Sequence, residues 1–571
     1  MTYGKKVHKR GSFYSTRLLH TKYYTFVLIW GVLWATPLLS YSQVQSAQLA
    51  TKHANTTVDQ IRFTATKTSH DTPMISDYIT SWNLYNDSYL AAHFELDHPL
   101  THYLSLLDAD TGEKERLAKG NFQFTFLVDD QVVYEENLHP GAGTIEDKKT
   151  KLSYNIPMVT SKPIDFWGWF MWLKFMKMGG GRDALNVGTH TLTLQLRAYL
   201  DADRLLLSDV LASGDLTIQV AERPIVKGTI AVQDIAPTSD WEISKDVIDH
   251  NTIETLNKKI LQNRFEHING IVVIKDDKLL LEEYFNGATR DSLHDTRSVG
   301  KSFTSALLGM AIADGYILDE RTTLNDYYPL ETFLNYSKEK AQVTLHDLLS
   351  MSSGFEGDDT QPNSRGNEEN MYPTSNWVKF ALDLPMAQPK SDTKSFSYFT
   401  AGVILLGDII NTKVPNGLIA YADKKLFSPL DIRSYRWQYT PKGVGNTAGS
   451  IQLRALDLAK FGQLYKNDGL WEGSQILPKS WVTKSLSTQV SISKAKQEGY
   501  GYLFWNKTLT VGDRSYEVSY SSGNGGNKIF IFKELALVVV ITASAYNLPY
   551  AHKDVEIMLT HYILPAIFDH S

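Results

Sequence analysis

Ser298 and Lys301 stand three residues apart at the start of an apolar segment, in the stretch DTRSVGKSFTSALLGMAIADGYI, residues 295–317. A serine becomes a nucleophile when a neighbouring base takes its proton, and the S-x-x-K spacing puts both side chains on one face of a helix. The free N–H groups at a helix N-terminus favour the oxyanion that forms during acyl transfer. Ser298 is therefore a candidate nucleophile; the alternative is a structural N-cap of the helix.

The S-x-x-K spacing alone does not decide between these two interpretations. It also begins at Ser337, Ser391, Ser491 and Ser493. Ser298 differs from these serines in the segment that follows it, which carries apolar residues at helical spacing and ends at Asp314-Gly315. We therefore expect a buried helix here, with Ser298 at or within its first turn.

Tyr398 and Thr400, in SFSYFTAGVILLGDII, precede a second apolar segment and provide a candidate base. A free phenol holds its proton up to about pH 10, but a neighbouring ammonium group favours the phenolate. Lys301 could supply that charge to both hydroxyls. The alternative is a core tyrosine with its hydroxyl bonded to the backbone, in a chain that has 30 tyrosines.

A third candidate lies in SYSSGNGGNKIF, where glycines precede a predicted strand. Gly523 would let the backbone approach a ligand, and an N–H group near Asn524 could be a second oxyanion donor beside that of Ser298. Ser522 and Thr400 are the candidate substrate-binding hydroxyls. The alternative interpretation is an ordinary glycine turn.

The elements around these residues indicate a multidomain chain. Residues 58–222 show the period-two alternation of strands and predict an all-β, sandwich-like domain. Residues 223–244 carry two prolines without a clear period and predict a linker. Residues 245–571 predict an α/β (α+β) domain, in which strands from both ends build one sheet around a helical subdomain. INGIVVIKDDKLLLEEYF predicts a hairpin that turns at Asp276-Asp277, and a cleft beside the sheet is the expected site.

One segment of the β region is unusually aromatic: IDFWGWFMWLKFMKMGGGRD, residues 164–183. It is shorter than the roughly 20 residues that span a bilayer. A core-packing helix or an inter-domain wedge is one interpretation. The alternative is a membrane-surface or partner contact, made by Phe166, Trp167, Trp169, Phe170 and Trp172.

The first 45 residues have the layout of a signal peptide or signal anchor, with six basic residues before an uncharged apolar run from Tyr24 to Leu39. We therefore expect an exported protein that is periplasmic, extracellular or anchored facing outward. A net charge of −6 without a basic patch gives no indication of nucleic-acid binding, and the absence of cysteine excludes disulfides and thiolate catalysis. The chain contains no H-E-x-x-H motif, so no metal site is predicted.

The order of the three candidate motifs resembles the serine β-lactamase and penicillin-binding-protein superfamily. The resemblance extends over residues 245–566, through TLHDLLSMSSGFEG at 344 and GSIQLRALDLAKFGQLYKNDGLWEGSQILPKSWV at 449. Within the superfamily the chain is most similar to class C-type esterases and amidases of the 6-aminohexanoate-dimer hydrolase group. The resemblance implies a β-lactamase-like fold, an acyl-enzyme on Ser298, proton transfer by Lys301 and Tyr398, and no cofactor.

Two departures from class C β-lactamases affect the expected substrate. Those enzymes carry Asn where Thr400 stands, and Lys-Thr-Gly where Ser521, Ser522 and Gly523 align. Without that lysine a carboxylate-binding site is not expected, which favours a small-molecule or peptide-like ester or amide as substrate. The alternatives are a DD-peptidase or penicillin-binding protein, and a non-catalytic scaffold that keeps the fold.

Overall fold

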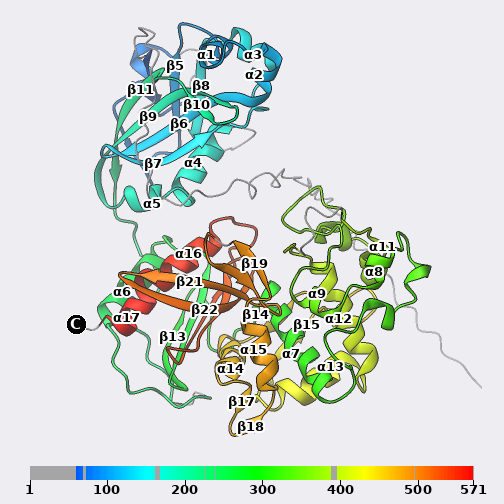
Figure 1. The fold of residues 1–571 in the computed structure, drawn as a ribbon. Coiled ribbons are helices and arrows are strands. Elements are labelled where there is room, and N and C mark those ends of the chain that lie inside the picture. The colour runs from blue at the N-terminus through cyan, green and yellow to red at the C-terminus, as the bar shows by residue number, and fades with distance from the viewer. Residues whose placement is uncertain are drawn as a thin grey trace, which may run out of the picture.

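The computed structural model of the chain describes residues 59–67, 73–160, 167–225, 227–237, 240–387, 395–493 and 495–569. Buried apolar side chains form one core within residues 61–220 and two more within residues 241–567. We call residues 59–220 the N-terminal region and residues 240–569 the C-terminal region (Figure 1). The predicted signal segment, residues 1–45, lies outside the described residues.

The N-terminal region contains two sheets that contribute to one core. The larger sheet has the order β1 (Asp59–Gln60), β11 (Ala212–Val220), β9 (Gly188–Asp201), β6 (Gly120–Val128) and β7 (Gln131–Asn137), with β10 (Leu205–Leu207) beside β9 and β4 (Ser81–Asn83) beside β11. The smaller sheet has the order β3 (Tyr78–Ile79), β2 (Arg62–Thr64), β5 (Leu90–Glu95) and β8 (Ser153–Val159). The alternation of apolar residues along β9 produces its alternating burial, as the sequence pattern predicts.

The all-β prediction for this region is wrong in one respect, because helices stand between the strands. They are α1 (Leu100–Leu107), α2 (Glu113–Lys119), α3 (Ile145–Thr150), α4 (Trp167–Lys177) and α5 (Gly181–Ala184). Most of these helices are one or two turns long. They contain too few residues for the helical apolar period of 3.6 to be recognised in the sequence among the surrounding strands.

Helix α4 comes from the aromatic segment and packs into the core of its own region. Phe175 stacks on Phe126 with ring centroids 4.6 Å apart. Trp172 is only 8% exposed, so the predicted membrane-surface contact is wrong for this residue. Trp167, Trp169 and Phe170 are partly exposed, and for them the contact stays a prediction. Phe166 lies outside the described residues.

Within the described ranges, no single helix is long and apolar enough to cross a membrane. The segments Thr400–Lys413 and Gly417–Phe427 meet the length and composition limits only as a pair that bends by 80°. Most of Thr400–Lys413 is buried in the core of the C-terminal region.

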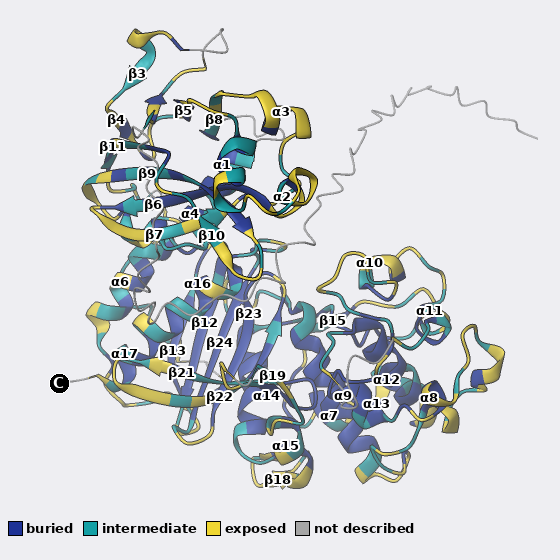
Figure 2. Ribbon diagram, turned by 45° about the horizontal axis from the view of Figure 1, so that its top comes forward, coloured by how far each residue is buried: buried dark blue, intermediate teal, exposed yellow. Residues whose placement is uncertain are grey.

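The C-terminal region is built on an antiparallel sheet whose central strands are buried on both faces (Figure 2). Its strand order is β13 (Lys278–Tyr284), β12 (Ile268–Lys275), β24 (Leu537–Ala543), β23 (Asn527–Phe532), β22 (Arg514–Gly523), β21 (Trp505–Val511), β20 (Glu498–Tyr500) and β19 (Val490–Ser493). Alternate residues of β24 enter different cores, since Val538 and Val540 join one and Val539 and Ile541 the other. The pairing of β12 with β24 confirms that strands from both ends build the sheet, and the hairpin at Asp276-Asp277 is confirmed as well.

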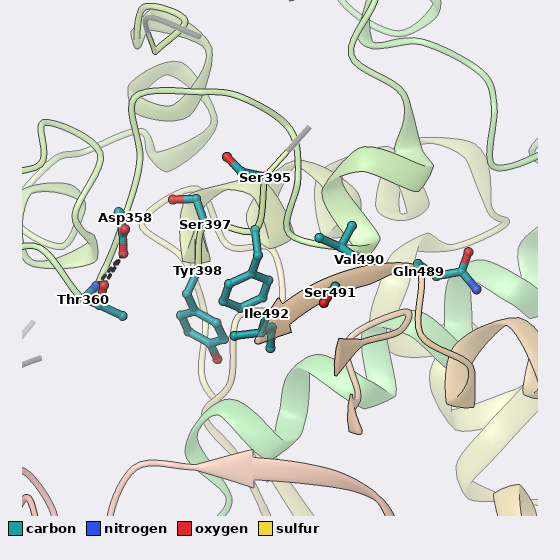
Figure 3. A pocket seen from close by; sticks show the side chains of 10 residues that line it. Asp358, Thr360, Ser395, Ser397, Tyr398, Gln489, Val490, Ser491 and Ile492 are labelled. Carbon is teal, nitrogen blue, oxygen red and sulfur yellow. Dashed lines mark hydrogen bonds between the residues drawn. The ribbon is translucent and has the colours of Figure 1, made fainter. Parts of the chain in front are cut away.

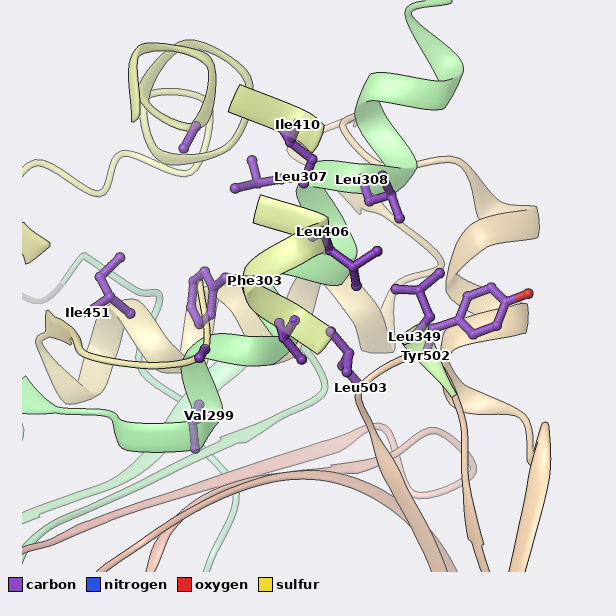
Figure 4. Close-up of a cluster of buried hydrophobic side chains, with 14 of the residues drawn as sticks. Val299, Phe303, Leu307, Leu308, Leu349, Leu406, Ile410, Ile451, Tyr502 and Leu503 are labelled. Carbon is purple, nitrogen blue, oxygen red and sulfur yellow. The ribbon is translucent and has the colours of Figure 1, made fainter. Parts of the chain in front are cut away.

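Helices cover both faces of this sheet. One face carries α6 (His250–Leu261), α16 (Ala551–Met558) and α17 (Leu564–Phe568). The other carries α7 (Gly300–Ala313) and α14 (Ala455–Lys466), with a helical layer beyond them made of α9 (Leu345–Leu349), α11 (Trp377–Asp383), α12 (Thr400–Lys413), α13 (Gly417–Ala422) and α15 (Lys479–Leu486). Phe303 of α7 stacks on Phe461 of α14 with centroids 3.8 Å apart. Figure 4 shows Phe303 within the cluster of buried side chains that includes Val299 and Leu307. Helix α7 is therefore fixed in the core, which fixes the residues at its N-terminus.

Short elements complete the C-terminal region. They are β14 (His294–Asp295), β16 (Ile451–Leu453) and β15 (Tyr435–Trp437) in one small sheet, β17 (Leu470–Trp471) with β18 (Ser474–Gln475), and the helices α8 (Lys338–Ala341) and α10 (Glu368–Met371). Strand β14 leads directly into the turn η2 (Arg297–Val299) that carries Ser298. Pairing of β14 with β16 brings residues 448–453 beside this turn.

Candidate active site

Ser298 lies in the turn η2, directly before α7, as the sequence predicts. Lys301 Nζ lies 2.8 Å from Ser298 Oγ and also donates a hydrogen bond of 2.6 Å to the carbonyl oxygen of Ala448. Lys301 is 1% exposed. The burial and the second hydrogen bond hold the amine against the serine hydroxyl, the arrangement that a Ser–Lys nucleophile requires.

Two glycines allow the chain to close around the peptide of Ser298. A Cβ at Gly449, where φ is +149°, would lie 2.7 Å from the carbonyl oxygen of Arg297. A Cβ at Gly523 would lie 2.3 Å from the carbonyl oxygen of Thr296 and 3.3 Å from the amide nitrogen of Ser298. Arg297 itself has a φ of +49°, which only a tightly constrained turn imposes on a non-glycine residue. The predicted approach of Gly523 to the nucleophile is therefore present in the fold.

Tyr398 lies beside Lys301, in the segment that leads into α12. Lys301 Nζ is 5.3 Å from the centroid of the Tyr398 ring. The ring stacks on Trp505, with centroids 5.8 Å apart and planes inclined by 23°. The structure thus brings Tyr398 beside Lys301, the two residues that were predicted to move the proton, although they lie far apart in the sequence.

Thr400 is the first residue of α12 and is completely buried. Its N–H group donates a hydrogen bond of 2.8 Å to Asp359 Oδ2. Among the described residues, Lys301 donates to Ser298 and Ala448 rather than to the Thr400 hydroxyl. A direct contact of Thr400 with substrate stays a prediction.

Asp359 is a residue of the site that the sequence analysis did not single out. Its carboxylate accepts hydrogen bonds of 2.8 Å from the N–H groups of Thr400 and Glu368, and its own N–H donates to the Tyr398 carbonyl oxygen at 2.8 Å. Burial and the charge of Glu368 raise the pKa of Asp359 to about 7, against the opposing effects of Thr400 and Lys301. Asp359 therefore fixes the segment that carries Tyr398.

The third predicted motif is divided between the two faces of β22. The Ser521 hydroxyl faces α7 and lies 2.6 Å from the hydroxyl of Ser302. Ser522, the next residue along the strand, points to the opposite face, where it accepts a hydrogen bond of 2.7 Å from Lys528 Nζ. Ser522 was predicted to bind substrate, but in the structure its hydroxyl is turned to Lys528 and away from Ser302 and α7. Asn524 follows in the turn between β22 and β23.

A model of the family described as Beta-lactamase matches residues 258–560, which is more than half of the chain. The chain belongs to the beta-lactamase family. The matched residues contain Ser298, Lys301, Tyr398 and the turn after β22 of this beta-lactamase-family region.

Three solved structures show similar folds. A 6-aminohexanoate-dimer hydrolase, described as putative, from Bacillus anthracis is 20% identical with a TM-score of 0.43, over 53% of this chain and 81% of that one. A beta-lactamase, also described as putative, from Bacteroides dorei DSM 17855 is 17% identical with a TM-score of 0.44, over 56% of this chain and all of that one. A penicillin-binding protein homologue from Pyrococcus abyssi is 19% identical with a TM-score of 0.42, over 56% and 79% of the two chains.

The beta-lactamase-family region has a cavity of about 680 Å³ beside Tyr398 (Figure 3). It lies between the segments at Asp358 and Ser395 and the edge strand β19. Its lining mixes hydroxyls with apolar groups: Thr360, Ser395, Ser397 and Ser491 stand beside Phe396, Val490 and Ile492. The cavity is large enough for a small-molecule substrate. The polar segment 358–377 contributes Asp358 and Thr360 to it.

The arrangement supplies the parts that acyl transfer to a serine requires. A serine hydroxyl is bonded to a buried amine, a phenol stands beside the amine, and the backbone N–H of Ser298 lies at the N-terminus of α7. No group of three or more Asp, Glu or His side chains that could hold a metal ion occurs among the described residues.

Proposed function

We propose that the protein is an exported serine hydrolase that cleaves an ester or an amide through an acyl-enzyme on Ser298. The observation that carries the proposal is the hydrogen bond from Lys301 to Ser298 beside the Tyr398 ring, at the N-terminus of a buried helix. Membership of a family of serine hydrolases supports the reaction class.

The reaction begins with transfer of the single Ser298 hydroxyl proton to one base, the phenolate form of Tyr398 beside the Lys301 ammonium, while Ser298 Oγ attacks the substrate carbonyl carbon. The oxyanion of the tetrahedral intermediate accepts hydrogen bonds from the Ser298 N–H and from an N–H in the turn near Asn524. Collapse breaks the ester or amide bond, and the stored proton goes to the leaving oxygen or nitrogen. Water then attacks the acyl-enzyme and releases the acid.

Penicillin-binding activity is the second candidate among enzymes, because the family includes that chemistry. The position that aligns with the lysine of Lys-Thr-Gly is Ser521, which is 1% exposed and bonded to Ser302. A buried hydroxyl there cannot supply the missing cation, so the esterase or amidase is favoured.

Intact-mass spectrometry tests these proposals directly. The purified protein is incubated in parallel with a p-nitrophenyl ester, a fluorophosphonate and a penicillin. We expect the wild type to form an adduct with the ester or the fluorophosphonate, and we expect Ser298→Ala to lose it. Ser522→Ala is the matched control and should keep the adduct, because Ser522, like Ser298, is hydrogen-bonded to a buried lysine. A penicillin adduct would favour the penicillin-binding protein. No adduct with any reagent would favour the non-catalytic scaffold.

Export is a separate part of the proposal and rests on residues 1–45 alone. The masses of the protein from the membrane, soluble and secreted fractions of the producing cells test it. A mature chain that begins after the apolar run supports a cleaved signal, and a full-length chain in the membrane fraction supports an anchor. Full-length protein in the soluble interior would contradict export.

A further inference from the structure

We infer that the N-terminal region positions the active-site turn after β22, through contacts of Arg182 and Lys177 with the segment that ends at Tyr550. We call residues Ser544–Tyr550 the bridging segment, because it joins the inter-region contact to the turn. The inference rests on the proposed function, since it assigns that turn to the oxyanion. It gives the N-terminal region a task in the reaction.

The first step of the inference is a buried ionic network between the two regions. Arg182 of α5 lies 2.9 Å from Glu266 Oε1 and 3.6 Å from Asp554 Oδ2, and it donates a hydrogen bond of 2.7 Å to the carbonyl oxygen of Arg264. The side chains of Arg182 and Asp554 are only 7% and 6% exposed. Charges removed from water to this extent need all their partners, so the network fixes the two regions in one arrangement.

The second step connects this network to the bridging segment. The Tyr550 hydroxyl donates a hydrogen bond to Glu266 Oε2, on the same carboxylate that Arg182 and Lys177 bind. Lys177 Nζ lies 4.5 Å from the centroid of the Tyr550 ring, and the Arg182 guanidinium lies 5.4 Å from it. Tyr550 is 5% exposed. Its hydroxyl is therefore held by Glu266, and its ring is held by the cations of Lys177 and Arg182.

The third step connects the bridging segment to the turn. Asn547 N–H donates to Asn524 Oδ1 at 2.8 Å, and Asn524 Nδ2 donates to Asn547 Oδ1 at 2.6 Å. The N–H of Ala545 donates to the Gly525 carbonyl oxygen at 3.2 Å. The turn contains Gly525 and Gly526, both at positive φ, and glycines leave a backbone free to move unless other contacts hold it. The bridging segment supplies such contacts.

A fourth contact reaches the residue before the nucleophile. The Arg297 guanidinium lies 4.4 Å from the centroid of the Tyr546 ring. The bridging segment therefore touches both sides of the proposed oxyanion site, at the turn near Asn524 and beside Ser298. A displacement of Tyr550 would therefore be transmitted to the turn near Asn524 and to Arg297, because five residues or fewer of the bridging segment separate Tyr550 from the residues that contact them.

Hydrogen exchange of the full-length protein tests the inference without depending on catalysis. In Arg182→Gln, we expect the amides of residues 524–526 and 545–547 to exchange at least about tenfold faster than in the wild type. Lys149→Gln is the matched control, because Lys149 pairs with Glu113 within the N-terminal region at side-chain exposures of 42% and 49%. Unchanged exchange in a folded Arg182→Gln protein would overturn the inference.

Steady-state kinetics separates positioning from a merely structural role. With active sites counted by fluorophosphonate, we expect Arg182→Gln and Asn547→Ala each to lower kcat for an ester about tenfold, with KM within about twofold. The double variant should be no slower than the slower single variant, because both changes release the same turn. Additive effects, or a kcat within twofold of wild type for Arg182→Gln, would overturn the inference.

Two further outcomes keep the tests distinct. If Arg182→Gln does not fold, Tyr550→Phe replaces it in the exchange experiment, because this substitution removes only the hydroxyl that binds Glu266. For Tyr550→Phe we expect the same amides to exchange about threefold faster than in the wild type. If the wild type forms no adduct with any reagent, the proposed function fails. The exchange experiment then still decides whether the N-terminal region holds the turn.

Discussion

Among its described residues, the C-terminal region contains two buried lysines that are each hydrogen-bonded to a serine, and we propose a catalytic role for one of the two pairs. Lys301 and Ser298 are 2.8 Å apart, and Lys528 and Ser522 are 2.7 Å apart. The lysines are 1% and 7% exposed. By distance and burial alone the two pairs cannot be distinguished.

Their surroundings separate them. Ser298 stands at the N-terminus of α7, where backbone N–H groups are available. A tyrosine ring stands beside each lysine, so this feature does not separate the two pairs. Ser522 stands within β22, paired with Lys528 in the ladder, and Lys528 Nζ lies 4.7 Å from the centroid of the Tyr520 ring. Burial and the charge of Lys507 lower the pKa of Lys528 to about 7. The comparison teaches that a Ser–Lys hydrogen bond is suited to acyl transfer only where backbone N–H groups that can hold an oxyanion adjoin it.

The largest expected effect is that of Ser298→Ala, which removes the nucleophile. We expect ester turnover to fall to the background rate, with the circular dichroism spectrum of the folded protein retained. Turnover is measured with a p-nitrophenyl ester, and adduct formation by intact mass. Residual turnover above about 1% of wild type would show that another residue, Ser522 included, carries the reaction.

Tyr398→Phe removes the phenol hydroxyl and keeps the ring that stacks on Trp505. We expect kcat/KM to fall by about a thousandfold, because the Ser298 proton then lacks the phenolate that accepts it. Tyr500→Phe is the matched control, since Tyr500 also packs against Trp505, with centroids 5.0 Å apart. Equal effects of the two substitutions would mean that Tyr398 acts by packing.

Asp359→Asn weakens the hydrogen bond that the Asp359 side chain accepts from the N–H of Thr400, two residues after Tyr398, and we expect kcat to fall about tenfold. The free energy of unfolding should also depend on pH through Asp359, because its raised pKa favours the protonated carboxyl in the folded protein. The contribution of Asp359 to the free energy of unfolding is therefore present below its ordinary pKa of 3.8 and is lost as pH rises to about 7. Urea unfolding of both proteins across this window measures it; a constant difference between them would contradict the assignment.

Lys528→Met replaces the second lysine with an apolar side chain of similar length. Because the pKa of Lys528 falls from 10.5 to about 7 on folding, the unfolded chain binds more protons in this window. The free energy of unfolding of the wild type should then rise with pH, by at most about 1.4 kcal/mol per pH unit, and the variant should lack that contribution. Urea titrations between these pH values measure the slope. Identical slopes for the two proteins would mean that Lys528 keeps its charge in the folded protein throughout this pH range.

Ser522→Ala should have the smallest effect on activity, within about twofold. The loss of a hydrogen bond to Lys528 should lower the free energy of unfolding by about 1 kcal/mol. Thermal unfolding and ester kinetics measure the two quantities. A hundredfold loss of turnover would break the comparison and restore the prediction that Ser522 binds substrate.

Local pattern predicted the helix that begins near Ser298, Lys301 on the same face and the β12–β13 hairpin, because each depends on residues a few positions apart. The family resemblance decided that Ser298 is predicted to be a nucleophile and not only an N-cap. Tyr398 and Gly523 were predicted from the order of motifs, which the family resemblance supplied. The orientation of Ser522 was not predictable, since a register change of one residue reverses the face of every side chain on a strand. Asp359 escaped notice because its contacts with Thr400 and Glu368 exist only after a polar loop folds back on α12.

The pairing of β12 with β24 has a consequence for the order in which the protein acquires its structure during synthesis. Ile268 pairs with Ala543, so the central strands of the sheet meet only when almost the whole C-terminal region has left the ribosome. The core of the N-terminal region uses only residues up to Val220 and can form much earlier. Ser298 is thus made long before Gly523, and an incomplete chain carries a nucleophile that has no oxyanion site.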